Sequence, residues 1–223
     1  MIRGIVFDLD DTLYPYDEYL ESGFLVTAKY LGAKYGVDPR QALEYMKALH
    51  SRRKVKEVFS NTVKRFKLDS AVAIELVSVF RKHKPVLALF SGYRPLLDAL
   101  ARSYILGLLV DGEPDVQERK ITALRIDRYF KSLLYAGKYE DSKAKPHPFL
   151  YQLMARVMGL HPKETVFVAD NPFLDFIGAR KAGFLTVRTL TGEYADKEST
   201  TDFDADHRIQ DLHALPEVLR LYE

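Results

Sequence analysis

The chain contains the stretch Gly4-Ile-Val-Phe-Asp-Leu-Asp-Asp-Thr-Leu13, in which a short apolar run ends at a group of acidic residues. Residues 4–7 are apolar or glycine throughout, which is typical of a strand buried in a parallel sheet. Asp8 and Asp10 follow at the carboxyl end of this strand. Because ligands of open parallel sheets bind just outside the carboxyl ends of the strands, we expect both acids at the ligand-binding edge.

Strands and helices alternate in the sequence from about residue 96 onward. The pattern predicts strands at 104–110, 132–136, 165–169 and 185–188, and helices at 114–125, 147–158, 172–182 and 211–222. Repeated strand–helix units are typical of a mostly parallel sheet covered on both faces. We therefore predict an α/β fold with a Rossmann-like parallel sheet and helices on both of its faces.

The roughly seventy residues after the first strand show helical periodicity alone. Leu20, Phe24, Ala28 and Leu31 recur at steps of three or four residues, and three further helical stretches follow before residue 85. A purely helical block that interrupts an alternating pattern indicates an insertion. We predict an α/β core domain at 1–14 and 86–223, with an inserted all-helical cap domain at 15–85.

Composition limits the functions that the chain can have. Its 223 residues are 47% hydrophobic and 29% charged, as in a soluble globular protein, and the net charge of +2 is too small to indicate nucleic-acid binding. The absence of cysteine excludes disulfides, thiolate metal sites and cysteine nucleophiles. We find no signal peptide and no apolar run long enough for a bilayer, so we expect a cytoplasmic protein without membrane or nucleic-acid partners. The sequence does not indicate the oligomeric state.

Further polar residues follow the other predicted strands. One pair of acids alone is weak evidence, since acids after strands often form turns or helix caps. The complete ordered set across several strands is much stronger, and carboxylates without cysteine or a matched histidine pair suit a hard cation, above all Mg²⁺. Together with a nearby lysine, the set comprises Asp8, Asp10, Asp111, Gly112, Lys145, Asp170 and Asp175.

These motifs resemble those of the haloacid dehalogenase-like (HAD) hydrolase superfamily, and the resemblance covers nearly the whole chain. The stretch 8–13, Asp-Leu-Asp-Asp-Thr-Leu, is similar to the first motif of the superfamily. Lys145-Pro-His-Pro148 resembles the third motif, and Val168-Ala-Asp-Asn-Pro172 with Asp175 resembles the fourth. The helical insertion is similar to the small C1-type cap of this superfamily.

The resemblance implies a role for each of these residues. Asp8 would be the nucleophile that forms an aspartyl-phosphate, and Asp10 the acid and base that serves the leaving alcohol and then the water. Mg²⁺ would bind the Asp8 carboxylate, the backbone carbonyl of Asp10 and Asp170, with Asp175 as a ligand or a support. Lys145 would offset charge on Asp8 and on the phosphoryl oxygens.

The second motif departs from the superfamily pattern. Its strand normally ends in Thr or Ser, whose hydroxyl binds a phosphoryl oxygen, but Val110 stands at that position here. Val has nearly the shape of Thr, so the fold is not affected while one hydrogen bond is lost. We expect the backbone N–H groups of Asp111 and Gly112 to bind the phosphate instead.

The resemblance implies Mg²⁺-dependent hydrolysis of a small phosphomonoester. The continuation Thr12-Leu-Tyr-Pro15 is similar to the branch that holds pyrimidine nucleotidases, which makes a nucleotide the first substrate candidate, followed closely by phosphoglycolate and a sugar phosphate. Two alternatives within the superfamily are a phosphoglucomutase-like activity and 2-haloacid dehalogenation, the latter disfavoured by Asp10. An alternative of another class is a weakly active Mg²⁺-binding interaction protein, which Val110 suggests and the intact acids oppose.

Overall fold

The computed structural model describes residues 1–50, 55–200 and 202–223. Residues 51–54, which belong to the predicted cap, and residue 201 lie outside the described residues. The chain divides into two compact units. One consists of Met1–Tyr16 and Leu87–Glu223, and the other of Asp17–Val86.

The first unit contains a parallel sheet with the strand order β3-β2-β1-β4-β5-β6. Its strands are β1 (Gly4–Phe7), β2 (Ile105–Val110), β3 (Ser132–Tyr135), β4 (Thr165–Ala169), β5 (Leu185–Thr189) and β6 (His207–Ile209). In the central register Gly4 is paired with Ile105 on one side and with Thr165 on the other. The parallel α/β architecture predicted from the sequence is thereby confirmed. Strand β6 was not predicted, because it has three residues and two of them are polar.

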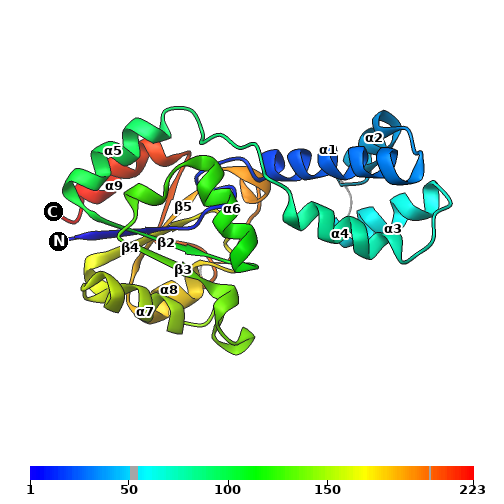
Figure 1. The fold of residues 1–223 in the computed structure, drawn as a ribbon. Coiled ribbons are helices and arrows are strands. Elements are labelled where there is room, and N and C mark those ends of the chain that lie inside the picture. Colours follow the sequence, from blue (N-terminus) through cyan, green and yellow to red (C-terminus); the bar gives the residue numbers. More distant parts are fainter. Residues whose placement is uncertain (51–54, 201) are drawn as a thin grey trace. The chain divides into compact units, whose positions relative to one another are not determined.

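Helices cover both faces of this sheet (Figure 1). They are α5 (Tyr93–Ser103), α6 (Pro114–Leu124), α7 (Phe149–Met158), α8 (Phe176–Ala182) and α9 (Leu215–Arg220). Figure 1 shows α5 and α9 on one face and α7 and α8 on the other, as right-handed crossovers between parallel strands require. The predicted helix at 172–182 begins only at Phe176, because Asn171 forms a turn: its side chain accepts a hydrogen bond from the Phe173 backbone N–H at 3.0 Å.

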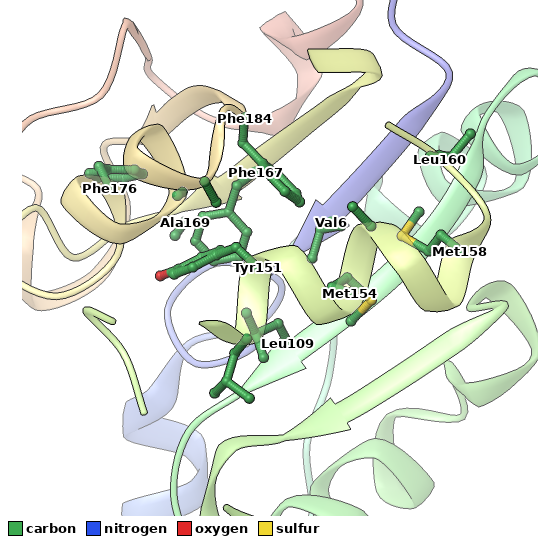
Figure 2. Packing of buried hydrophobic residues seen from close by; sticks show 14 of the residues in the cluster. Val6, Leu109, Tyr151, Met154, Met158, Leu160, Phe167, Ala169, Phe176 and Phe184 are labelled. Carbon is green, nitrogen blue, oxygen red and sulfur yellow. The ribbon is translucent and has the colours of Figure 1, made fainter. Parts of the chain in front are cut away.

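A hydrophobic cluster fills the space between the sheet and helices α7 and α8 (Figure 2). The strands contribute Val6, Leu109, Phe167 and Ala169, while the helices and their ends contribute Tyr151, Met154, Met158, Leu160, Phe176 and Phe184. Burying one large apolar side chain stabilises the fold by about 1.5–3 kcal/mol. This packing fixes the ends of β1, β2 and β4, from which the polar residues of the site project.

The second unit is all-helical among its described residues. Its helices are α1 (Tyr16–Tyr35, which begins in the last residue of the first unit), α2 (Pro39–His50), α3 (Val55–Arg65) and α4 (Val72–Lys82). Phe24, Phe59 and Phe80, each from a different helix, form its centre, with ring centroids 5.5–6.1 Å apart. The helical insertion after the first strand therefore agrees with the periodicity of the sequence.

The strand order determines where the polar residues meet. From β1 the sheet continues through β2 to β3 on one side, and from β4 it continues through β5 to β6 on the other. The carboxyl ends of β1 and β4 therefore form the topological switch point of the sheet, the usual ligand-binding position in such folds. Asp8 follows β1 directly and Asp170 follows β4 directly.

Candidate active site

Lys145 is the centre of the polar cluster at this edge of the sheet. Its side chain is 0% exposed, and its Nζ lies 2.7 Å from Asp8 Oδ1, 3.0 Å from Asp111 Oδ2 and 2.9 Å from Asp175 Oδ1. The three acids follow β1 and β2 and precede α8. The structure thus brings together residues that the sequence separates by more than 160 positions. It also pairs the Asp111 carboxylate with Lys145, a contact that was not predicted from the sequence.

Burial and charge oppose each other in this cluster. Burial raises the pKa of Asp8 to about 8, and the Lys145 ammonium offsets only part of that increase. Burial likewise raises the pKa of Asp175, against the same opposing effect of Lys145. For Lys145 itself burial lowers the pKa, but the three surrounding acids together raise it well above the usual value. One ammonium therefore faces three carboxyl groups, and the cluster has an excess of acid groups.

Asp170 lies beside this cluster and is 4% exposed. Its Oδ1 accepts a hydrogen bond from the Thr12 hydroxyl at 3.3 Å. Burial raises the pKa of Asp170 to about 9, with further increases from Asp8, Asp175 and Asp11. Within the described parts of the chain, no lysine or arginine forms an ion pair with it. A buried acid without a basic partner, next to other carboxylates, has the chemistry of a divalent-cation ligand.

The geometry of the carboxylates agrees with a metal site. Asp8, Asp111 and Asp175 each offer one oxygen atom, and these three atoms lie within 4.8 Å of one another. Because the Lys145 ammonium already contacts all three acids, it neutralises part of their charge. Asp170 receives no such compensation from a basic residue in the described ranges, and Asp8 raises its pKa further, so the surroundings of Asp170 are the better position for a cation.

Asp10 has partners different from those of Asp8. Its side chain is 33% exposed, and both of its oxygens contact the Lys120 ammonium, at 2.9 Å and 2.7 Å. The Tyr14 hydroxyl donates a hydrogen bond to Asp10 Oδ1 at 2.5 Å. The two acids of the first motif therefore have separate charge partners, Lys145 for Asp8 and Lys120 for Asp10.

Val110, Asp111 and Gly112 form the end of β2 and the turn after it. Val110 is 2% exposed and is paired with Tyr135 of β3. Gly112 has a φ of +95°, a conformation that residues with a side chain rarely adopt. The amide nitrogen of Gln117 lies 3.1 Å from the position that a Cβ at Gly112 would occupy. Phosphate binding by these three residues stays a prediction.

Two contacts position the lysine loop and the start of α8. The Tyr151 hydroxyl donates a hydrogen bond to the backbone carbonyl of Asp175 at 2.7 Å, which fixes the main chain that carries this acid. A Cβ at Gly178 would overlap the carbonyl oxygen of Pro146. Glycine is therefore required for α8 to approach the loop that carries Lys145.

Lys120 and Gln117 were not predicted as candidate site residues. Both belong to the predicted helix at 114–125, and both are buried on the same face of α6 as Ile121 and Leu124. Their positions on the apolar face of the predicted helix are the signal that could have identified both residues. A lysine on such a face is buried, and a buried lysine needs a charged partner. The amide oxygen of Gln117 is buried without a hydrogen-bond partner among the described residues.

The strand order, the helical insertion after β1 and the acids at the strand ends define a Rossmann-like α/β enzyme with an inserted cap. The family model for haloacid dehalogenase-like hydrolases matches residues 5–189. The chain belongs to this family of hydrolases, as its motifs predicted.

Individual relatives agree with this family. A glyceraldehyde 3-phosphate phosphatase from Methanocaldococcus jannaschii is 30% identical over 232 residues, covering 99% of this chain and 98% of the relative. The structure of a 2-haloacid dehalogenase from Pseudomonas syringae pv. Tomato aligns with a TM-score of 0.68, 25% identity and 100% coverage of both chains. A putative HAD-hydrolase from Bacillus subtilis bound to magnesium aligns with a TM-score of 0.69 and 16% identity, over 98% of each chain.

The described helices of the protein are too short or too polar for a membrane span. None of those in residues 1–50, 55–200 and 202–223 combines the length and the apolar character that crossing a bilayer requires.

Proposed function

We propose that the protein is a Mg²⁺-dependent phosphomonoester hydrolase that acts on a small phosphorylated metabolite. The observation that carries the proposal is the buried pair of Asp8 and Lys145 at the end of β1, with Asp10 two residues further on. Among substrates, a triose phosphate such as glyceraldehyde 3-phosphate is the first candidate, because the relative from Methanocaldococcus jannaschii is named for it. A nucleotide, phosphoglycolate and a sugar phosphate are the other substrates to test.

The reaction proceeds in two displacements at phosphorus. In the first, an Asp8 oxygen forms a bond to phosphorus while the bond to the substrate oxygen breaks, and the Asp10 carboxyl group gives its proton to that leaving oxygen. In the second, Asp10 takes a proton from water as the water oxygen bonds to phosphorus and the Asp8–phosphorus bond breaks. The products are the alcohol and inorganic phosphate, and both acids return to their starting states.

The other residues stabilise charge during these steps. The Lys145 ammonium contacts Asp8 directly and can neutralise charge on the phosphoryl oxygens as they approach this carboxylate. The backbone N–H groups of Asp111 and Gly112 donate to the phosphate. Val110 contributes no hydroxyl, so this protein has one hydrogen bond fewer at that oxygen than its motif normally supplies.

Mg²⁺ would be bound by the carboxylates of Asp8 and Asp170 and by the backbone carbonyl of Asp10, with Asp175 as a ligand or a support. The buried Asp170, whose carboxyl group has no basic partner in the described residues, supports this assignment. When bound, the ion supplies positive charge that neutralises the phosphoryl oxygens.

The test is phosphate release from a panel of substrates with Mg²⁺. The panel contains glyceraldehyde 3-phosphate, phosphoglycolate, a hexose phosphate and a nucleoside monophosphate, and product analysis of the hexose phosphate detects a mutase. A separate assay measures chloride release from 2-chloropropionate, because a dehalogenase shares this fold at 25% identity. We expect phosphate release and no chloride release. Absence of phosphate release from every substrate would contradict the proposal.

A further inference from the structure

Lys120 is a buried lysine outside the motifs that the proposed chemistry uses. Its side chain is 2% exposed, although it lies on a surface helix where most lysines extend into water. Its Nζ contacts both oxygens of Asp10 and also lies 4.9 Å from the centroid of the Tyr16 ring. Both contacts are favourable for a cation.

Packing alone does not account for a lysine at this position. Lys120 shares the buried face of α6 with Ile121 and Leu124. An apolar residue of similar length, such as methionine, would fill the same space without burying a charge. The ammonium is therefore explained by its partner, the Asp10 carboxylate.

Tyr14 acts on the same carboxylate from another direction. It is fully buried, and its hydroxyl donates to Asp10 Oδ1, the oxygen that also accepts from Lys120. The two partners come from separate segments, the turn after β1 and helix α6. Hydrogen bonds from two separate segments hold the Asp10 carboxylate in one orientation, while a third of its side chain stays exposed.

We propose that Lys120, assisted by Tyr14, is a positioning residue that orients Asp10 for proton transfer to the leaving group. The inference rests on the proposed function, in which Asp10 gives a proton to the leaving oxygen. A proton donor acts only when it lies within hydrogen-bond reach in the correct orientation. Lys120 contributes by fixing Asp10 and does not itself contact the reacting atoms.

The test compares two leaving groups in the variant Lys120→Met. p-Nitrophenyl phosphate has a leaving group that needs no proton, whereas an alkyl phosphate such as glyceraldehyde 3-phosphate has one that does. The ratio kcat/KM reports the steps up to the first irreversible one, here the formation of the aspartyl-phosphate. We expect kcat/KM to fall about 100-fold for the alkyl phosphate and less than about fivefold for p-nitrophenyl phosphate.

Two further variants complete the experiment. Lys131→Met is the matched control: this exposed lysine, whose Nζ contacts the Met158 carbonyl, should leave both ratios unchanged. Tyr14→Phe removes only a hydroxyl and should lower kcat/KM for the alkyl phosphate alone, by about tenfold. This variant decides the question if Lys120→Met does not fold.

The possible outcomes separate the inference from the proposed function. A wild-type enzyme without phosphatase activity on any substrate of the panel contradicts the proposed function, and the inference with it. If the wild type hydrolyses a different alkyl phosphate of the panel, that substrate replaces glyceraldehyde 3-phosphate in the comparison. A second outcome is an active wild type whose folded variants lose kcat/KM equally on both substrates, or keep the wild-type kcat/KM on both. This outcome overturns the positioning role alone. A selective loss on the alkyl phosphate supports it, because a general loss of structure would not distinguish leaving groups.

Discussion

Asp8, the proposed nucleophile, shows how a buried carboxylate can be unfavourable for folding. It is buried next to two other acids, and burial raises its pKa to about 8 in spite of the Lys145 ammonium. At neutral pH, ionising Asp8 therefore has a free-energy cost in the folded protein that is absent in the unfolded chain, and this difference lowers the free energy of unfolding. This cost is the reason to expect opposite effects of substitution on activity and on stability.

Asp8→Asn should abolish phosphatase turnover, by at least about 1,000-fold, while the melting temperature stays constant or rises. The substitution removes the attacking oxygen at nearly constant size, and Lys145 keeps Asp111 and Asp175 as partners. Phosphate release and thermal unfolding of the same preparation measure both effects. Wild-type activity in the variant would show that Asp8 is not the nucleophile.

Val110→Thr tests the departure from the second motif. Val110 is buried at the end of β2, and Thr has nearly the same volume, so the packing should survive although a buried hydroxyl carries a cost without a partner. With substrate bound, the hydroxyl can donate to a phosphoryl oxygen, and kcat/KM should rise about tenfold. An unchanged or lower kcat/KM in a folded, metal-binding variant would mean that Val110 has no influence on the rate.

The sequence predicted which candidate site residues directly follow strands. The positions of Asp8 and Asp170 after β1 and β4 follow from the local apolar pattern and do not depend on packing. Because β1 and β4 are neighbours in the sheet, their carboxyl ends lie side by side. The partners of Asp10 could not be derived in this way. Whether Lys120 faces Asp10 depends on the rotation of α6 about its axis and its distance from β1, which local sequence does not determine.

The helical unit contains a polar contact between two elements. Glu75 of α4 accepts hydrogen bonds from Lys34 at 2.7 Å and from Tyr35 and Tyr30 at 2.8 Å, all on α1. These bonds, with that of Lys34 as the largest contribution, lower the pKa of Glu75 to about 2. The contact is solvent-exposed, so its effect on stability is small.

Glu75→Gln should lower the melting temperature at pH 7 by at most about 4 °C. Because the pKa of Glu75 in the folded protein lies below its usual value of about 4.5, the stabilisation is present above pH 4.5 and is lost as the pH falls toward 2. The difference between the variant and the wild type should therefore shrink over this window in circular dichroism melts. Glu44→Gln on the exposed surface of α2 is the control. A difference independent of pH would contradict the ion-pair explanation.

Element boundaries followed the sequence where apolar patterns were strong. Strand β4 has the predicted bounds of Thr165–Ala169, and each of its residues is buried. The predicted boundaries were wrong, or a strand was not predicted, where a side-chain hydrogen bond or pairing with a distant strand determines the element. Asn171 delays the start of α8 through a side-chain hydrogen bond, and β6 exists because Val187–Thr189 of β5 provides a pairing edge.

At the scale of the whole molecule, the excess of buried acids would couple binding of the proposed metal ion to folding. Asp8, Asp170 and Asp175 all have raised pKa values, chiefly because of burial. A divalent cation that binds the folded protein would reduce their repulsion and stabilise the fold by mass action. Metal removal should therefore affect activity and stability together.

Excess chelator should abolish phosphatase activity, and Mg²⁺ should restore it better than Ca²⁺, because Mg²⁺ holds tight octahedral geometry. Saturating Mg²⁺ should also raise the melting temperature by about 5 °C or more. Asp170→Asn should eliminate this increase without lowering the melting temperature of the metal-free protein, since it removes an uncompensated buried acid. The exposed Asp196→Asn should behave as wild type. Full activity in chelator, or an undiminished Mg²⁺ effect on the melting of Asp170→Asn, would exclude Asp170 as a ligand.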